Sequence, residues 1–373
     1  MTLKLNGLKK DELLSLELRE LFESYGFVHY KMSKFEEYSF YMDNKNFLKS
    51  EQIIAFTDKA GKLLALKPDI TLSIAKNSQA SADVNEKLYY NESVYRYAKH
   101  NKEYREVQQM GLEVMGNIDD YQTLEIILLS LKSLQKISDN FVLDISHMGL
   151  IAGLFELLDI TSDTAKDSIL ECLVTKNSHD LIKIATKCGV KSEGISLLKS
   201  VLDSPTNVAK AIAFWQSIAQ NDTLKAAVND LEKLYTNLII TPYIANIRVD
   251  ISIVNDTNYY NNIIFQGYIK DVPFAVLSGG RYDLLMQKFG RDINAMGFAL
   301  TLDELSRYFP LQRDKNATVA VLYDSTTDIK KLNKVIENEQ ALGGMVTALS
   351  TLPLTTNFGK IINLTSKAEG SYV

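Results

Sequence analysis

The hydrophobic and polar positions of the N-terminal third follow two different periods, which predicts a mixture of helices and strands. Apolar residues at helical spacing, including Leu14, Leu18 and Phe22, predict a helix over residues 10–25 that ends at Gly26. Alternating or continuous β-type runs then predict strands, joined by turns and one further helix. The predicted strands are 27–31, 53–57, 62–66, 87–96 and 106–116, and the predicted helix is 71–76.

The middle of the chain has a different pattern, because consecutive helical segments stand between two blocks of predicted strands. A helix at 121–134 and a strand at 141–145 precede six helical patterns between 151 and 238, where strand signals are few. We interpret residues 160–240, with approximate bounds, as a helical insertion. Strands are predicted again at 244–254, 263–269 and 272–277, and a strand followed by a helix at 295–308.

The last part of the chain begins after Pro310 and predicts a small α/β domain. Its elements are a strand at 317–323, a helix at 328–342 and a strand at 345–350. The pattern as a whole predicts an α+β fold with two domains. Residues 1–310 are expected to form a large antiparallel sheet flanked by helices, and residues 311–373 the small domain.

Composition and charge narrow the classes of function. A chain of 373 residues that is 46% hydrophobic and 23% charged buries a large core. Its net charge of -5 argues against a protein that grips nucleic acid, since phosphate binding needs a concentrated excess of Lys and Arg. Cys172 and Cys188 lack the spacing of metal ligands, so we interpret them as structural thiols of a reducing cytoplasm. No apolar run approaches the roughly 20 residues of a membrane span, so we expect a cytoplasmic protein.

One predicted strand carries polar residues on a single face. Gln109, Gly111 and Glu113 alternate, so their side chains point to the same side of the sheet. A glycine between two polar groups leaves room for a small ligand, although a solvated face gives the same alternation. Asp69 stands just before a predicted helix, where a carboxylate can cap free backbone N–H groups.

The order of several segments resembles the catalytic core of histidyl-tRNA synthetase, over about the first 308 residues. Residues 66–71 are similar to that family's Leu-Arg-Pro-Glu-x-Thr motif, and Arg96 falls on the arginine of its second motif. Gln109 and Glu113 match its Gln-x-Gly-x-Glu pattern, and residues 254–260 align with its Val-Arg-Gly-Leu-Asp-Tyr-Tyr signature. The fold that this resemblance implies is that of the class II aminoacyl-tRNA synthetases.

The resemblance implies a pocket for histidine. In the family, the acid and threonine of the first motif hold the amino group of bound histidine, and Gln and Glu line the pocket. A tyrosine pair there is suited to stack on and hydrogen-bond an imidazole ring, although two tyrosines can also be packed core aromatics. The residues implied are Asp69, Thr71, Arg96, Gln109, Glu113, Tyr259 and Tyr260.

A glycine turn is predicted shortly after the tyrosine pair. Residues 278–283 include the family's Gly-Gly-Arg-Tyr-Asp sequence. Its glycines permit a close backbone approach to a ligand or a tight connection from strand to helix. We interpret Arg281 either as a ligand contact or as half of a structural ion pair.

Other positions depart from the family pattern, chiefly where the synthetases handle ATP. Ala98 replaces an acid that helps to hold ATP, and Ser33 replaces the proline of the first, dimer-forming motif. Asn255 replaces an arginine that stabilises charge during adenylate formation, and such a loss typically costs roughly 100- to 1000-fold in rate. Glu304 replaces the arginine that binds the γ-phosphate, which reverses the sign of the interaction. We therefore expect no ATP activation and no catalytic residues.

These departures resemble the regulatory subunit of ATP phosphoribosyltransferase, a synthetase-like family without catalysis of its own. Its members assemble with a short-form catalytic subunit in the first step of histidine biosynthesis and mediate feedback by histidine. The resemblance implies histidine as effector, no cofactor, and a homodimer within a hetero-oligomer. Residues 311–373 are too few for a complete anticodon-binding domain. A free-standing histidine sensor, a translation-linked paralogue and an active histidine–tRNA ligase remain as alternatives.

Overall fold

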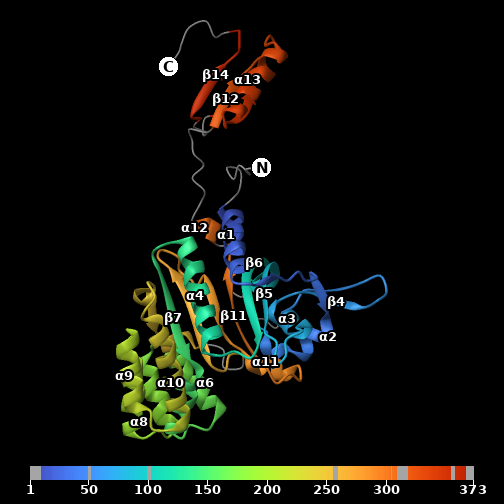
Figure 1. Cartoon of the computed structure of the whole chain (residues 1–373). Helices are drawn as coiled ribbons and strands as arrows, with labels where there is room; N and C mark the ends of the chain where they lie inside the picture. Colours follow the sequence, from blue (N-terminus) through green and yellow to red (C-terminus); the bar gives the residue numbers. More distant parts are fainter. Residues whose placement is uncertain are drawn as a thin grey trace. The chain divides into compact units, whose positions relative to one another are not determined.

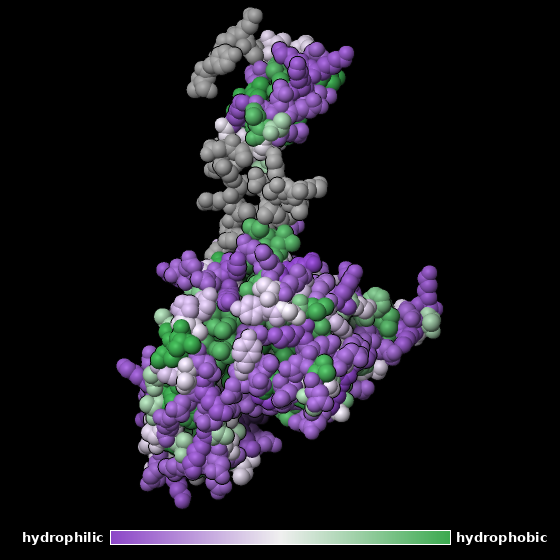
Figure 2. All heavy atoms as spheres, in the orientation of Figure 1, coloured by the Kyte–Doolittle hydropathy of each residue, from purple (hydrophilic) through white to green (hydrophobic). Residues whose placement is uncertain are grey.

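The computed structural model describes residues 10–48, 52–98, 102–254, 259–303, 305–308, 318–353 and 358–366. The chain divides into two compact units, Met1–Phe309 and Pro310–Val373. Figure 1 shows the elements of both units, and each unit is described by itself. The visible face of the molecule is mostly hydrophilic, with hydrophobic residues exposed in separate patches (Figure 2).

The first unit is built on a mixed sheet that has eight strands within the described residues. Their order is β1-β5-β6-β11-β10-β9-β7-β8. The five inner pairings are antiparallel, whereas β1 with β5 and β7 with β8 pair in parallel at the two edges. The strands are β1 (Val28–His29), β5 (Glu86–Ala98), β6 (Glu103–Gly116), β7 (Phe141–His147), β8 (Ile247–Val249), β9 (Ile263–Ile269), β10 (Leu277–Arg281) and β11 (Asn294–Thr301). This sheet, with its helices, confirms the predicted α+β fold.

Helices α1 (Lys10–Ser24) and α4 (Asp120–Ile137) pack on one face of the main sheet (Figure 1). Asp119 caps α4, since its side chain accepts hydrogen bonds from the backbone N–H groups of residues 121 and 122. Apolar side chains at helical spacing then face the sheet and build the principal core. They include Leu18, Phe22, Ile127, Leu131 and Leu134, all fully buried.

A second core lies beside the hairpin of β5 and β6. A small antiparallel sheet contributes β2 (Phe35–Glu37), β4 (Leu63–Leu66) and β3 (Ala55–Thr57). The helices are α2 (Tyr38–Asp43), α3 (Thr71–Asn77) and α11 (Asp283–Lys288), and the 3₁₀ turn η2 (Lys45–Phe47) follows α2. Tyr41, Leu72, Ile74, Met115 and Leu285 are buried together here. This core supports one side of the pocket described below.

Six helices follow one another between β7 and β8 within the described residues. They are α5 (Met148–Leu157), α6 (Asp163–Val174), α7 (Ser178–Lys187), α8 (Ser192–Leu202), α9 (Val208–Ile218) and α10 (Asp222–Leu238). Asparagine side chains cap three of them, because Asn177, Asn207 and Asn221 accept from backbone N–H groups of α7, α9 and α10. The helices gather in one bundle (Figure 1). The chain leaves the sheet at the end of β7 and returns beside the same strand, since Ile247 at the start of β8 pairs with Leu143 of β7.

The second unit is a small parallel sheet with one helix among its described residues. Strands β12 (Thr318–Leu322), β13 (Met345–Leu349) and β14 (Lys360–Asn363) pair in the order β13-β12-β14, and α13 (Ile329–Ala341) connects the first two. Val319, Val321 and Leu332 form its core. This arrangement confirms the predicted α/β character of the C-terminal part.

The strand predicted over 244–254 is wrong in most of its length. Only β8 is a strand, and it lies between the 3₁₀ turns η3 (Ile244–Asn246) and η4 (Ile251–Ile253). Asp250 explains where the strand ends, because its side chain accepts from the backbone N–H of Ser252 at 2.9 Å and starts the turn. The apolar residues of η4 are nevertheless buried, which is why they read as a buried strand.

The strand predicted over 272–277 is wrong except at Leu277, where β10 begins, and the glycine turn predicted after it is also wrong. Val272 and Val276 are buried outside any strand, whereas Gly279 and Gly280 lie inside β10. A Cβ atom on Gly279 would stand 2.4 Å from the carbonyl oxygen of Gly297 on β11. These glycines therefore permit a close approach between neighbouring strands rather than a turn.

Candidate functional site

The structure brings all seven predicted pocket residues around one small cavity. Asp69 and Thr71 stand at the start of α3, Arg96 on β5, Gln109 and Glu113 on β6, and Tyr259 and Tyr260 just before β9. The cavity has a volume of about 30 Å³. Tyr90, Ser278 and Tyr282 also line it, together with residues 297–299 of β11.

Glu113 is the buried carboxyl group of this pocket. It is 2% exposed, and it accepts hydrogen bonds from the Thr71 hydroxyl at 2.8 Å and the Tyr282 hydroxyl at 2.6 Å. Burial raises the pKa of Glu113 to about 8, because the charged form loses its hydration, and the two hydrogen bonds only partly oppose this. The group is therefore mostly protonated at neutral pH, and it offers the pocket a neutral carboxylic acid.

Asp69 and Arg96 form the polar wall beside this acid. Asp69 Oδ1 accepts from the backbone N–H of Leu72 at 2.9 Å, so it does cap α3. Its other oxygen lies 3.7 Å from Arg96 Nη2, and Arg96 Nε donates to the carbonyl of Pro68 at 2.9 Å. The capping role and a place in the pocket are thus compatible, and the guanidinium is fixed against the wall rather than extended toward solvent.

Aromatic rings close the rest of the pocket. Tyr259 and Tyr260 meet edge to face with centroids 4.7 Å apart, and Tyr282 lies 5.8 Å from Tyr259. Burial raises the pKa of Tyr90, Tyr259 and Tyr282 well above the ordinary value, so these hydroxyls stay neutral. The predicted tyrosine pair is therefore both packed against the core and part of the cavity wall.

The space expected beside Gly111 is occupied. A Cβ atom there would stand 2.5 Å from the Tyr90 hydroxyl oxygen and 2.3 Å from the carbonyl of Phe298. Gly111 therefore makes room for the Tyr90 ring, not directly for a ligand. Tyr90 was missed in the sequence, although its position opposite Gly111 in the β5–β6 ladder is the signal that pairs them.

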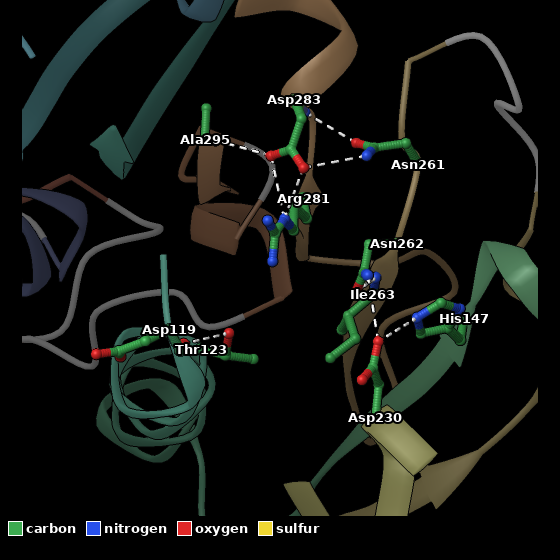
Figure 3. Close-up of polar contacts among 10 residues, drawn as sticks. All are labelled: Asp119, Thr123, His147, Asp230, Asn261, Asn262, Ile263, Arg281, Asp283 and Ala295. Carbon is green, nitrogen blue, oxygen red and sulfur yellow. Dashed lines mark hydrogen bonds and ion pairs between the residues drawn. The ribbon is translucent and has the colours of Figure 1, made fainter. Parts of the chain in front are cut away.

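Arg281 forms a structural ion pair with Asp283. Its Nε donates to Asp283 Oδ2 at 2.8 Å, and Asp283 also accepts from the backbone N–H of Ala295 and the side chain of Asn261 (Figure 3). The backbone N–H of Asp283 donates to Asn261 Oδ1 in return. This network fixes the residue that follows Tyr260.

Some predicted features lie outside the described residues. Asn255 and Glu304, which replace two ATP-handling arginines of the resembling family, are among them. The expectation that ATP is not activated therefore stays a prediction from sequence. No helix in the described ranges is both long enough and apolar enough to cross a membrane.

Comparison with known proteins places the chain in a family. The family model described as histidyl-tRNA synthetase matches residues 4–305. The chain belongs to the histidyl-tRNA synthetase family. Within this family it is similar to the ATP phosphoribosyltransferase regulatory subunit of Clostridium kluyveri, with 29% identity covering 84% of this chain and 82% of the relative. The corresponding protein of Oceanobacillus iheyensis is 26% identical, covering 80% and 73%. The predicted resemblance to a synthetase-like paralogue is confirmed.

Solved structures of the histidyl-tRNA synthetase family have the same fold. A Bacillus halodurans structure, described as an ATP phosphoribosyltransferase regulatory subunit/histidyl-tRNA synthetase, aligns with a TM-score of 0.75 and 22% identity, covering 96% of this chain and 94% of that one. A histidyl-tRNA synthetase from Nostoc aligns with a TM-score of 0.71 and 17% identity, covering 92% and 83%. These alignments confirm the class II synthetase-like architecture.

Proposed function

We propose that this chain is the non-catalytic regulatory subunit of ATP phosphoribosyltransferase, which acts in the cytoplasm with a short-form catalytic subunit. The observation that carries the proposal is the similarity along most of the chain to proteins of that name. A chain of the Thermotoga maritima ATP phosphoribosyl transferase complex aligns with this chain with a TM-score of 0.62, so it has the same fold. The replacements at Ala98, Asn255 and Glu304 fit a synthetase-like protein that no longer activates an amino acid.

Histidine is the effector that the pocket suits. The neutral Glu113 acid, the Gln109 amide and the Asp69 carboxylate provide both donors and acceptors beside the aromatic wall of Tyr260. A free volume of about 30 Å³ admits roughly two water molecules but not an amino acid. Histidine must therefore displace pocket side chains when it binds. A ligand that binds two conformations unequally can regulate a distant site, typically with a coupling free energy of about 1–3 kcal/mol.

A homodimer within the larger assembly is part of the proposal. β1 is an edge strand, and its residue Val28 is 64% exposed. Phe35 and Phe56 are exposed large hydrophobics of the small sheet and stack edge to face with centroids 5.7 Å apart. An uncovered strand edge with apolar side chains nearby favours pairing with a second chain.

The assay that tests the proposal mixes this chain with a short-form catalytic subunit. Product formation from ATP and phosphoribosyl pyrophosphate is measured with and without histidine, against each protein alone. We expect activation that histidine reverses. An absence of complex and activation would favour a free-standing histidine sensor, and histidine-dependent exchange of pyrophosphate into ATP would favour an active ligase.

Two pocket variants test the site of histidine control. Tyr260→Ala removes an aromatic wall and Gln109→Ala removes an amide, so each is expected to raise the half-inhibitory histidine concentration about tenfold or more, equivalent to about 1.4 kcal/mol. Activation of the catalytic subunit should persist in Gln109→Ala. Tyr121→Ala, which truncates an exposed tyrosine at the start of α4, is the control and should inhibit normally. Unchanged inhibition in both pocket variants would refute the assignment of the pocket.

A further inference from the structure

A large cleft lies next to the small pocket, and the proposed histidine control does not use it. Its volume is about 1020 Å³. One wall comes from α5 and α6. The other comes from Tyr260 and Asn261, which precede β9, and from Leu284 on α11. Its apolar lining consists mainly of Met148, Ile151, Phe155, Ile160, Leu170 and Leu284.

The lining of this cleft is acidic. Four carboxylate side chains stand in it, those of Glu156, Asp159, Asp163 and Asp167, against the single ammonium group of Lys166. Lys166 Nζ lies 3.6 Å from Asp163 Oδ1, so it offsets the charge of one of the four carboxylates. Of these carboxylates, all within the described part of the chain, the other three have no ion-pair partner. An occupant of this cleft must therefore supply positive charge.

The two walls of the cleft are joined at its inner end. The backbone N–H of Met148 donates to the carbonyl of Asn262 at 2.9 Å. His147 Nδ1 accepts from the backbone N–H of Gly149, and its Nε2 lies 3.4 Å from Asp230 on α10. Asp230 also accepts from the side chain of Asn262 (Figure 3). These contacts tie the helical bundle to the start of β9, so the cleft is already formed before anything binds.

Tyr260 lines both the cleft and the histidine pocket. Its ring packs on Gly280, where an added Cβ atom would stand 2.6 Å from Tyr260 Cδ1. Asn261, the next residue, is held by Asp283. The Tyr260 side chain is thus the shared wall between the two spaces, and a ligand that moves it from one side changes the surface presented to the other.

We propose that this cleft receives a segment of the catalytic subunit that carries basic side chains around apolar ones; the inference rests on the proposed function. The volume is at the upper end of the roughly 300–1,000 Å³ typical of small-molecule sites, which favours a peptide segment. Four carboxylates repel phosphate groups, so nucleic acid is the wrong chemistry. The cleft offers apolar side chains and carboxylates together, which suits an amphipathic segment that buries apolar side chains in the groove and places basic ones against the carboxylates.

Charge reversal on the cleft tests this proposal. Glu156→Lys combined with Asp167→Lys is expected to weaken binding of the catalytic subunit at least tenfold and to reduce the salt dependence of the dissociation constant. The control is Glu171→Lys combined with Asp203→Lys, which makes the same charge change at exposed residues of the bundle outside the cleft. Binding is measured by titration calorimetry at low and high salt, with far-UV circular dichroism of each variant.

A second variant keeps the test independent of charge. Leu284→Ser removes an apolar side chain that is 39% exposed, and it should weaken binding several-fold. Wild-type affinity in both Leu284→Ser and the cleft charge reversal would overturn the docking site and leave the proposed function standing. Equal weakening in the control double variant would also overturn it, since net charge alone would then explain the loss. If the wild-type chain binds no catalytic subunit at all, the proposed function itself fails, and the docking site with it.

Discussion

Replacing Gly279 with alanine is expected to lower the free energy of unfolding by about 3 kcal/mol. The new methyl group would stand 2.4 Å from the carbonyl oxygen of Gly297 and 2.6 Å from both Phe265 and Phe298. Two of these contacts are with β11, the strand that pairs with β10 residue by residue. The sheet cannot open locally without losing ladder hydrogen bonds, so the strain must remain. Urea unfolding followed by circular dichroism measures the loss.

Gly194→Ala is the matched control for this prediction. An added Cβ atom in α8 would meet only the side-chain ends of Leu158 and Val190, at 2.8 Å, and flexible groups can move aside. Alanine also improves the helix by about 1 kcal/mol relative to glycine. We therefore expect a change near zero. A similarly small effect at Gly279 would mean that the approach of β10 to β11 is much looser than the distances indicate.

The free energy of unfolding is expected to fall by roughly 3 kcal/mol as the pH rises from about 5 to 8, because Glu113 holds its proton in the folded state. The pKa of Glu113 is raised to about 8 in the folded chain, against an ordinary value of 4.5. Between these two values the folded state holds a proton that the unfolded state has released. The unfolded state therefore binds fewer protons, and the free energy of unfolding decreases with rising pH.

Glu113→Gln isolates this contribution. The amide is close in size, still accepts a hydrogen bond from Tyr282 or Thr71, and does not titrate, so most of the pH dependence should disappear. Asp144 adds a slope of the same sign at lower pH, since burial raises its pKa to about 6, and it remains in the variant. The difference between variant and wild type above pH 6 is therefore the decisive measurement. Glu20→Gln, at an exposed position, should leave the wild-type profile intact, and an intact profile in Glu113→Gln as well would refute the assignment.

Much of the fold follows from local signals in the sequence. The strand at 263–269 has the bounds that the sequence predicts, and α4 lies within a few residues of its predicted helix, because uninterrupted periodicity marks both. The pocket residues were found through motifs spread over almost 200 positions, and the structure does gather them. Nothing in local periodicity would have joined Asp69 to Tyr260. Their proximity depends on how the strands are ordered in the sheet.

The errors arose where tertiary contacts override local preference. The apolar run at 272–276 reads as a strand, yet Val272 and Val276 are buried outside β10, which begins at Leu277 and continues through two glycines. Gly111 illustrates the same limit. Its missing side chain was correctly taken as a sign of needed space, but only the cross-strand register shows that the Tyr90 ring fills that space.

The pairing of β7 with β8 has a consequence for how this chain can vary over evolutionary time. Helices α5 to α10 lie between these two strands, so the bundle begins and ends beside the same strand of the sheet. The entropy of closing such a segment grows only with the logarithm of its length, about 0.6 kcal/mol per doubling. Helices can accordingly be gained, lost or exchanged there while β6, the strand that carries Gln109 and Glu113, keeps its register. Homologues that share the same pocket are therefore expected to differ most in the size and surface of this bundle.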